Sequence, residues 1–258
     1  KRVIFAEGED ENMLKAAIEF GKNKLGIPIL IGSENRIREQ LKKIGLDENF
    51  KIEIVNSTDK SKRDKYVKYL YKKLQRDGQL ERDVDRLIRN DRIAWGSSMI
   101  ACNDADAMVT GNIRHYAASI EKLKKVVEPR KGEEIFGMTM MVSKGKTILV
   151  ADTNVKDFPS AERLANVSIS CVRVARLFGF DPKVAFLSHS TFGKPVSKNT
   201  KHVRDAIELL KAKNVDFDFD GEMQPDVALN PIYQEVYPFS KIVGNANILM
   251  MPALHSAA

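Results

Sequence analysis

The chain has 258 residues, of which 43% are hydrophobic and 30% charged, and its formal net charge is +7. This balance is typical of a globular protein and excludes a disordered or fibrous chain. No apolar run reaches the roughly 20 residues that a membrane-spanning helix needs, so we expect no membrane partner.

The length suits one large domain or two of ordinary size. Because residue 1 is Lys and the first residues already resemble a strand, we expect a piece of a longer polypeptide without a signal peptide. The only cysteines are Cys102 and Cys171, which favours a reducing cytoplasm over a disulfide framework.

Strand and helix patterns alternate through the first half of the chain. Apolar runs predict strands over 3–6, 29–31, 52–55 and 107–110. Between them, Leu14, Ala17 and Ile18 share one helix face, and a second helix is expected to begin at Ser33 and end at Gly45. Repeated strand–helix units of this kind predict a parallel sheet covered on both faces.

Much of the positive charge lies between residues 60 and 92, in KSKRDKYVKYLYKKLQRDGQLERDVDRLIRNDR. Such a stretch can form a nucleic-acid patch. However, Tyr66, Leu70 and Leu74 recur at helical spacing and acidic residues are interleaved throughout. We therefore expect a solvated amphipathic helix here and no nucleic-acid partner.

A polar segment, EPRKGEE at 128–134, indicates a domain junction, which predicts domains at 1–128 and 129–258. The second half then shows a hairpin pattern around SKGK, a long helix from Ser160 to Gly179, a buried strand at 184–187, a further helix, and a last strand at 248–251. The predicted fold class is α/β: two domains with mainly parallel sheets and a ligand cleft between them.

Familiar cofactor motifs are absent. No GxGxxG follows a strand, and no GxxxxGK[ST] occurs, so neither a dinucleotide nor a nucleoside triphosphate fingerprint is present. The four histidines, at positions 115, 189, 202 and 255, have no partner at metal-ligand spacing. We accordingly expect no metal site.

Polar loops follow the predicted strands at 110–116, 151–160, 187–195 and 219–226, and a fifth segment follows the last strand from 251. Ligands bind at the carboxyl ends of strands in open α/β sheets. Hydroxyls, backbone amides and helix N-termini at these ends suit an anion, above all a phosphate. The alternative is that each loop contains only caps and turn residues.

Five segments, taken in order across almost the whole chain, resemble the phosphate acetyl/butyryltransferase family: FAEGEDE, NDADAMVTG, VAFLSHSTFG, DGEMQPDVALNP and GNANILMMPALHSA. Four further segments resemble, more narrowly, the C-terminal domain of large bacterial NADP-dependent malic enzymes: NIRHY, VVEPRKGEEIFGM, DTNVKDFPSAE and YPFSKIVGNANILMMPALHSA.

The resemblance implies two α/β domains, the second inserted into the first, in an isocitrate/isopropylmalate-dehydrogenase-like architecture with a coenzyme A cleft. In active members the thiolate of coenzyme A attacks the carbonyl of acetyl phosphate. That reaction needs a base for the thiol and fixed cations for the phosphate, which the family supplies as arginines.

Two departures from the family matter. Glu121, ten residues after Gly111, stands where active enzymes have an arginine. Exchanging a cation for a carboxylate beside a phosphate costs on the order of 1 kcal/mol even at high dielectric. The sequence also stops before the family's closing segment, which returns to the first domain with a Ser-Arg pair and an aspartate. Arg114 could replace the missing charge.

The resemblance therefore implies a domain without catalytic residues that binds acetyl-CoA as an effector and helps to assemble a homo-oligomer. Malate decarboxylation, with NADP and Mg or Mn, would belong to an N-terminal malic enzyme region of the same polypeptide. The alternatives are an active phosphate acetyltransferase and a purely structural oligomerisation module.

The predicted ligand residues come from the loops named above. Ser188, Ser190, Thr191 and Gly193 are expected to line the cleft and face pantetheine or phosphate. Arg114 and Lys194 are expected to contact phosphate. Weaker candidates, for which a role in turns is as good an explanation, are Asp220, Glu222 and Asn247.

Overall fold

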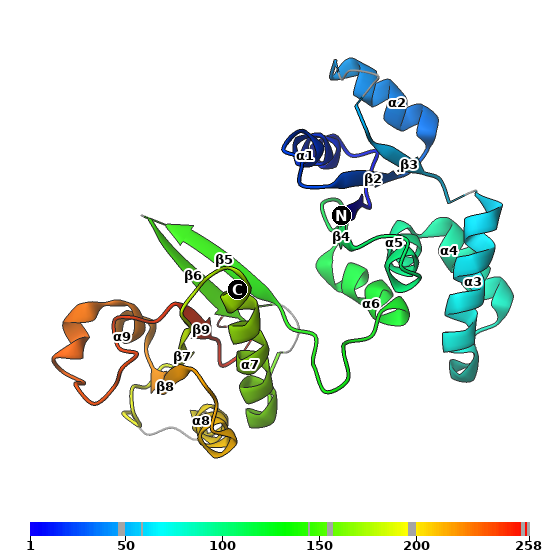
Figure 1. Cartoon of the computed structure of the whole chain (residues 1–258). Helices are drawn as coiled ribbons and strands as arrows, with labels where there is room; N and C mark the ends of the chain where they lie inside the picture. Colours follow the sequence, from blue (N-terminus) through cyan, green and yellow to red (C-terminus); the bar gives the residue numbers. More distant parts are fainter. Residues whose placement is uncertain are drawn as a thin grey trace. The chain divides into compact units, whose positions relative to one another are not determined.

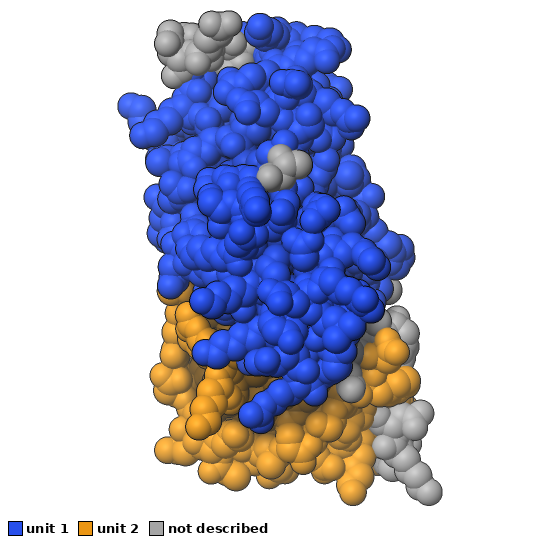
Figure 2. All heavy atoms as spheres, turned by 90° about the vertical axis from the view of Figure 1, so that its right-hand side faces the viewer, with its two compact units in different colours: residues 1–128 blue, residues 129–258 orange. Residues whose placement is uncertain are grey.

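Each half of the chain builds its own sheet and core in the computed structural model, which describes residues 1–45, 50–57, 59–143, 145–153, 157–195, 200–253 and 256. The chain divides into two compact units, Lys1–Glu128 and Pro129–Ala258, which Figure 2 colours separately. We call them unit 1 and unit 2. The ligand cleft expected between two domains stays a prediction.

Unit 1 contains a fully parallel four-stranded sheet with the order β3-β2-β1-β4 (Figure 1). Its strands are β1 (Arg2–Phe5), β2 (Ile27–Ile31), β3 (Glu53–Val55) and β4 (Ala107–Val109). Its helices are α1 (Glu11–Lys22), α2 (Glu34–Lys43), α3 (Lys60–Leu74), η1 (Gln75–Asp77), α4 (Glu81–Asn90), α5 (Arg92–Ala101) and α6 (Tyr116–Val126).

Both faces of this sheet are covered, as parallel strands require. In β2, Ile29 and Ile31 pack into the cluster that contains Trp95, whereas Leu30 packs on the other face with Leu14 and Ile37. This burial on both faces explains why the apolar runs in the sequence do not alternate with polar residues.

The charged stretch at 60–92 differs from the single helix that the sequence predicts. It forms α3 and α4, and Gly78 adopts a left-handed backbone with φ of 78° between them. Glycine adopts this conformation without the penalty of a Cβ atom, so it ends the η1 turn that follows α3. The predicted stripe is nevertheless buried, at Tyr66, Leu70 and Leu74.

Unit 2 contains a five-stranded sheet with the order β5-β6-β9-β7-β8. The pair β5–β6 is antiparallel, as the hairpin pattern predicts, and every other pair is parallel. The strands are β5 (Met138–Ser143), β6 (Lys146–Ala151), β7 (Lys183–Leu187), β8 (Asp218–Met223) and β9 (Ile248–Met250). The helices are α7 (Ala161–Leu177), α8 (Lys201–Lys213), α9 (Pro225–Leu229) and η3 (Pro231–Gln234).

Helix α7 begins where the sequence predicts. The Ser160 hydroxyl accepts a hydrogen bond from the Arg163 amide at 3.2 Å, and Gly179 follows the helix with a positive φ. Helices α7 and α8 cover one face of the sheet through Val184 and Phe186 of β7, while Ala185 and Leu187 pack on the other face. The prediction of an α/β fold with mainly parallel sheets is confirmed.

No helix among the described residues is long and apolar enough to cross a membrane.

Candidate ligand pocket

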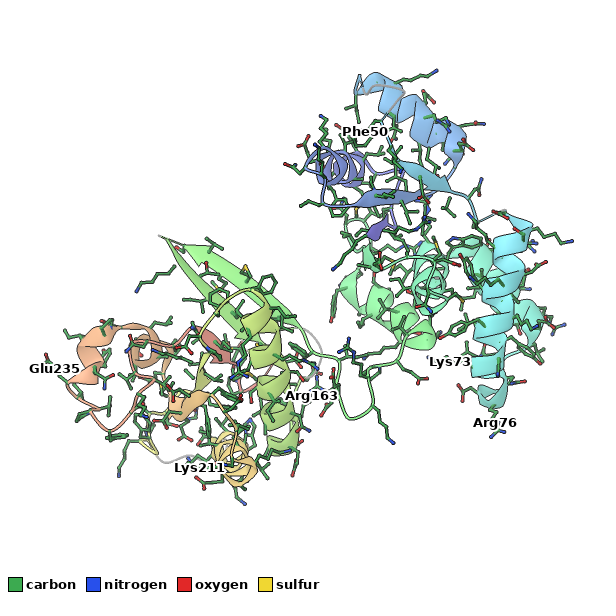
Figure 3. The ribbon with its side chains drawn as sticks, in the orientation of Figure 1. Phe50, Lys73, Arg76, Arg163, Lys211 and Glu235 are labelled. Atoms are coloured by element: carbon green, nitrogen blue, oxygen red, sulfur yellow. The ribbon has the colours of Figure 1, made fainter. Side chains whose placement is uncertain are left out.

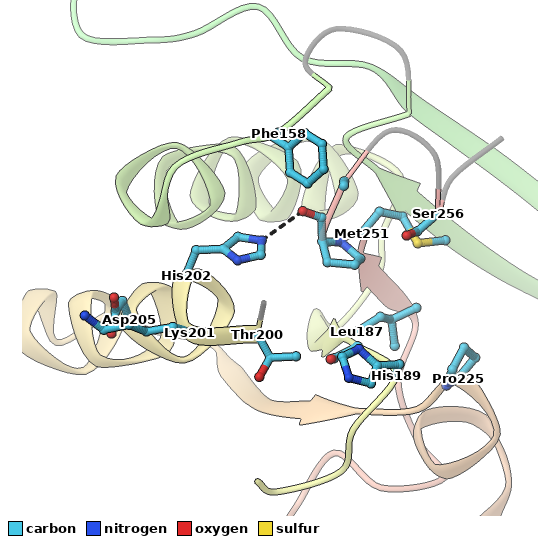
Figure 4. A pocket seen from close by; sticks show the side chains of 13 residues that line it. Phe158, Leu187, His189, Thr200, Lys201, His202, Asp205, Pro225, Met251 and Ser256 are labelled. Carbon is cyan, nitrogen blue, oxygen red and sulfur yellow. Dashed lines mark hydrogen bonds between the residues drawn. The ribbon is translucent and has the colours of Figure 1, made fainter. Parts of the chain in front are cut away.

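A pocket of unit 2 lies where neighbouring parallel strands end. Strands β9, β7 and β8 are adjacent in the sheet, so Met251, Leu187 and Pro225 come together at their carboxyl ends. The pocket has a volume of about 870 Å³, within the range of small-molecule sites. Its lining is Phe158, Leu187, Ser188, His189, Thr200, Lys201, His202, Asp205, Pro225, Met251, Pro252, Ala253 and Ser256 (Figure 4).

Helix α8 supplies the charged side of this pocket. Thr200 is its N-cap residue, and Lys201, His202 and Asp205 lie in its first turns. The amino end of a helix carries a partial positive charge from its unpaired amides, to which Lys201 adds a full one. The helix end and Lys201 favour an anionic group, a preference that the carboxylate of Asp205 reduces, whereas Leu187, Met251 and their neighbours favour an apolar group.

His202 is oriented by one backbone contact. Its Nε2 lies 3.0 Å from the Pro252 carbonyl oxygen, the contact drawn as a dashed line in Figure 4. Because a carbonyl oxygen only accepts, Nε2 carries the proton, and Nδ1 of the neutral ring is an acceptor. The contact fixes the orientation of the ring at the side of the pocket.

A buried network of charged and polar side chains holds two segments of the pocket in place. The Glu222 carboxylate is fully buried and accepts hydrogen bonds from the Ser190 hydroxyl at 2.7 Å and from Arg204 at 2.9 and 3.1 Å. Arg204 also donates to the Thr200 hydroxyl at 2.8 Å. Glu222 therefore links the loop after β7 to the first turn of α8, and it positions both walls of the pocket.

Of the residues predicted in the loop after β7, only Ser188 lines the large pocket. Ser190 is fully buried and donates to Glu222, so its hydroxyl faces the protein interior. Thr191 accepts from the Gln224 amide, and its backbone pairs with that of Lys194, whose side chain is exposed. Gly193 and Glu222 border a separate pocket of about 260 Å³.

The other two weaker candidates, Asp220 and Asn247, have local structural partners. Asp220, on β8, accepts from the amide of Gly221 at 2.8 Å. Asn247 precedes β9, accepts from the Lys183 amide at 2.8 Å and donates to the Asp181 carbonyl at 2.6 Å. These contacts lie at the amino ends of β7 and β9, the opposite edge from the pocket, so the structure does not bring Asn247 to the site.

In unit 1, Arg114 is held by a buried carboxylate. Its guanidinium donates to Asp91 at 2.7 Å, and Lys122 contacts the same oxygen. Burial raises the pKa of Asp91, but hydrogen bonds from Lys122, the Ala94 amide and Arg114 outweigh it, so the pKa lies below its usual value. Glu121 is exposed and pairs with Lys125 at 3.3 Å.

The carboxyl edge of the unit 1 sheet is also polar. Glu7 follows β1, is buried, and accepts from the Thr110 hydroxyl at 2.9 Å and the Gly111 amide at 3.0 Å. Asn112 donates to Asp10, the N-cap residue of α1, at 2.6 Å. The loop at 110–116 is thereby tied to the segment that follows β1.

Two predicted loops are described in part. In the loop at 151–160, Asp152 accepts from Arg163, which is labelled in Figure 3, at 2.6 Å and from the Gly137 amide at 2.7 Å. Residues 154–156 of that loop lie outside the described residues, as do 254, 255, 257 and 258 of the final segment.

Sequence reasoning did not place His189, Thr200, Lys201, His202 or Asp205 in the site. The histidines were considered only as metal ligands, and among the described residues no group of three His, Cys, Asp or Glu side chains could hold a metal ion. The signal that could have found them is topological: they follow β7 or begin the helix after it, at the edge where ligands bind.

Comparison with known proteins identifies relatives over the full length of the chain. The family described as "Phosphate acetyl/butaryl transferase" matches residues 1–258. The NADP-dependent malic enzyme of Rhizobium meliloti is 42% identical over the whole chain, and the probable NADP-dependent malic enzyme of Rickettsia prowazekii is 38% identical. The chain spans about a third of each of these relatives, 34% and 35% of their lengths.

A solved phosphotransacetylase from Streptococcus pyogenes has a similar fold. It superimposes with a TM-score of 0.89 at 27% identity, over 99% of this chain and 78% of that one.

Proposed function

The chain belongs to the phosphate acetyl/butaryl transferase family, and from this premise we propose that it is a receptor for an acyl-CoA, first of all acetyl-CoA, and that it does not transfer the acyl group. The pocket at the carboxyl ends of β9, β7 and β8 carries the proposal. Its apolar side suits the acyl and pantetheine chain, and the amino end of α8 with Lys201 suits a phosphate.

The cations of unit 1 support a role without catalysis. Glu121 occupies the position where the family resemblance implies an arginine, and its side chain is exposed. Arg114, which could have replaced that charge, donates to Asp91 instead. A cation neutralised by a buried carboxylate stabilises the charge on a departing phosphate less than one aimed at the ligand does.

The identity with NADP-dependent malic enzymes supports a second part of the proposal. We infer that the chain is the C-terminal region of such an enzyme, that acetyl-CoA acts as its effector, and that the polypeptide forms a homo-oligomer in the cytoplasm. NADP, the divalent metal and malate would bind to the remaining part of that polypeptide. An effector alters activity only if it binds two global states with different affinity.

Calorimetric titration of acetyl-CoA into the chain tests the binding. We expect a micromolar dissociation constant, about −8 kcal/mol. Lys201→Glu should weaken binding at least tenfold, because it places a carboxylate beside an anionic ligand. Lys213→Glu, the same charge change at the other end of α8, is the matched control and should bind as the parent does. Absence of heat at several temperatures would reject the receptor role.

An active phosphate acetyltransferase is the competing function, which the similarity to a phosphotransacetylase favours. Turnover of acetyl phosphate and coenzyme A separates the two. We expect none above background, from this chain or from the complete polypeptide, and turnover that Lys201→Glu abolishes would establish the enzyme instead.

A further inference from the structure

The loop after β7 determines which hydrogen-bonding groups the pocket presents at Ser188. This residue is 7% exposed and lines the pocket, whereas Ser190 is fully buried. A serine has two donors, its backbone N–H and its hydroxyl, and it has acceptors on its hydroxyl and carbonyl oxygens. Which of these groups a ligand can bind depends on which are already used within the fold.

The backbone amide of Ser188 is used within the fold. It donates to the carbonyl oxygen of Met223, the last residue of β8, at 2.9 Å. The next residue of the loop is held from the same side, because the Gln224 side chain donates to the His189 carbonyl at 2.8 Å. These contacts fix the backbone of the loop where it borders the pocket.

The hydroxyl proton of Ser188 is also used, and the cause is the buried carboxylate of Glu222. Arg204 donates to both oxygens of this carboxylate, which therefore acts only as an acceptor. The Ser190 hydroxyl must then be the donor in its 2.7 Å contact with Glu222. Because its only proton is committed there, Ser188 is the donor in the 3.3 Å contact between the two serine hydroxyls.

Ser188 consequently presents acceptors to the pocket and no donor. The Ser190 amide donates to Ser188 Oγ at 3.3 Å, and the described contacts leave the second lone pair of this oxygen for a ligand. An ionised phosphate has only acceptor oxygens, so it is repelled at this point. This result is the opposite of the anion preference that hydroxyls at a strand end suggest in the sequence. A ligand N–H or O–H fits instead.

We propose that Ser188 Oγ accepts a hydrogen bond from an amide N–H in the pantetheine arm of an acyl-CoA, an inference that rests on the function proposed above. The pantetheine arm contains two secondary amides separated by methylene groups. It therefore presents N–H donors along a chain that is otherwise largely apolar. The phosphates of coenzyme A, which have no donor when ionised, bind away from Ser188.

The distribution of charge around the pocket agrees with this orientation of the ligand. In Figure 4, Leu187 and His189, which flank Ser188 in the chain, are separated from Lys201 and Asp205 of α8. The amino end of α8 supplies donors and, through Lys201, a positive charge, which suit the phosphates. The part of the pocket around Ser188 has a buried acceptor beside an apolar side chain, which suits an amide between methylene groups.

Calorimetry on the full chain with acetyl-CoA and two analogues, each with one pantetheine amide replaced by an ester, tests the proposal. The ester exchanges the N–H for an oxygen acceptor. We expect one analogue to bind the parent about tenfold more weakly than acetyl-CoA, because two lone pairs then face each other. In Ser188→Ala, acetyl-CoA should bind about fivefold more weakly than it binds the parent, and the preference for the amide over that ester should largely disappear.

Two further variants show whether the direction of the Ser188 hydroxyl is the cause. Ser190→Ala removes the acceptor of the Ser188 proton, so Ser188 can turn its hydroxyl to the ligand, and the preference for the amide should fall here too. Ser168→Ala is the matched control, since it removes a fully buried hydroxyl that donates to the Ala165 carbonyl within α7, and it should keep the preference of the parent. If Ser190→Ala does not fold, Ser188→Ala decides.

The outcomes separate this inference from the function on which it rests. No binding of acetyl-CoA to the parent would reject both. If acetyl-CoA binds and Ser188→Ala leaves its affinity unchanged, only the contact with the amide is overturned. The same holds if Ser188→Ala weakens all three ligands equally, and that result would indicate an effect on a part of the ligand that all three share, such as a phosphate.

Discussion

At the scale of single residues, three of the four buried carboxylates among the described residues lie against arginines, and the fourth, Glu7, accepts from neutral donors. Glu222 faces Arg204, Asp152 faces Arg163, and Asp91 faces Arg114. An unpaired charge in a protein interior is costly, and these pairs offset that cost where the carboxylates join separate segments of the chain. They explain why several residues predicted as ligands are internal supports instead.

The pKa of Asp91 leads to a pH-dependent prediction. Because this pKa is lower in the folded protein, Asp91 stabilises the fold above its unfolded value of about 3.9, and this contribution is lost as the pH falls through the folded pKa. Asp91→Asn should lower the free energy of unfolding by about 2 kcal/mol at pH 7. The difference from the parent should be smaller at pH 3 than at pH 7.

Urea unfolding at pH 7 and pH 3 measures the difference in the free energy of unfolding between Asp91→Asn and the parent. The control is Glu121→Gln, at an exposed carboxylate, which should change stability little at either pH. An equal loss for Asp91→Asn at both values would show that charge is not the cause.

Cysteine reactivity gives a second prediction at this scale. Burial raises the pKa of Cys171 to about 12, so almost no thiolate forms at pH 8. In a Cys102→Ser variant, which leaves Cys171 as the only thiol, a thiol reagent should react only after denaturation. Modification of the native variant at the rate of a free thiol would contradict the burial of this side chain.

At the scale of helices and strands, capping explains where two predicted helices begin. Ser160 caps α7 through its hydroxyl, whereas Ser33 occupies the N-cap position of α2 without a side-chain hydrogen bond. The Ser33 amide instead donates to the carboxylate of Glu9 at 2.7 Å. The sequence predicted both starting points, but only the folded chain shows which hydroxyl is used.

Replacing each serine with alanine tests whether only the Ser160 hydroxyl stabilises its helix. Ser160→Ala should destabilise unit 2 by about 1 kcal/mol, because it removes the acceptor for the Arg163 amide. Ser33→Ala, its matched control, should cost much less. Thermal unfolding of the two variants measures the contrast, and equal costs would indicate that the Ser160 hydroxyl contributes no more than that of Ser33.

Element prediction from sequence succeeded for strands buried on both faces and failed for the charged stretch at 60–92. An uninterrupted apolar run such as 184–187 is typical of a strand that is buried on both faces of a parallel sheet. In the charged stretch the helical spacing of Tyr66, Leu70 and Leu74 predicted one helix although Gly78 is a local signal for a helix end, and the structure has a left-handed backbone there. The predicted buried face is correct because the spacing of apolar residues determines which side chains are buried. That spacing does not determine whether the helix is continuous.

At the scale of the whole molecule, two units with separate cores should unfold separately. Trp95, the only tryptophan, is fully buried in unit 1 and reports on that unit alone. Phe186→Ala, in the core of unit 2, should lower that unit's stability by about 3–5 kcal/mol. The unfolding midpoint seen by circular dichroism should shift, while the midpoint seen by Trp95 fluorescence stays in place.

The converse control is Leu70→Ala, which removes a side chain from the cluster that contains Trp95 and should move the fluorescence midpoint. If both probes shift together in Phe186→Ala, the two units form one cooperative structure and the separation is wrong.

What the sequence by itself determined is the α/β class, the order of most strands and helices, and the family, because periodicity, capping and ordered motifs are local properties of the chain. Only the tertiary structure decided which polar residues face a ligand pocket. Ser188 and His202 are brought together by parallel strand pairing and the placement of α8. Ser190 and Asn247, equally plausible in sequence, form hydrogen bonds within the fold instead. The direction of a side chain depends on segments distant in sequence, and no local pattern encodes it.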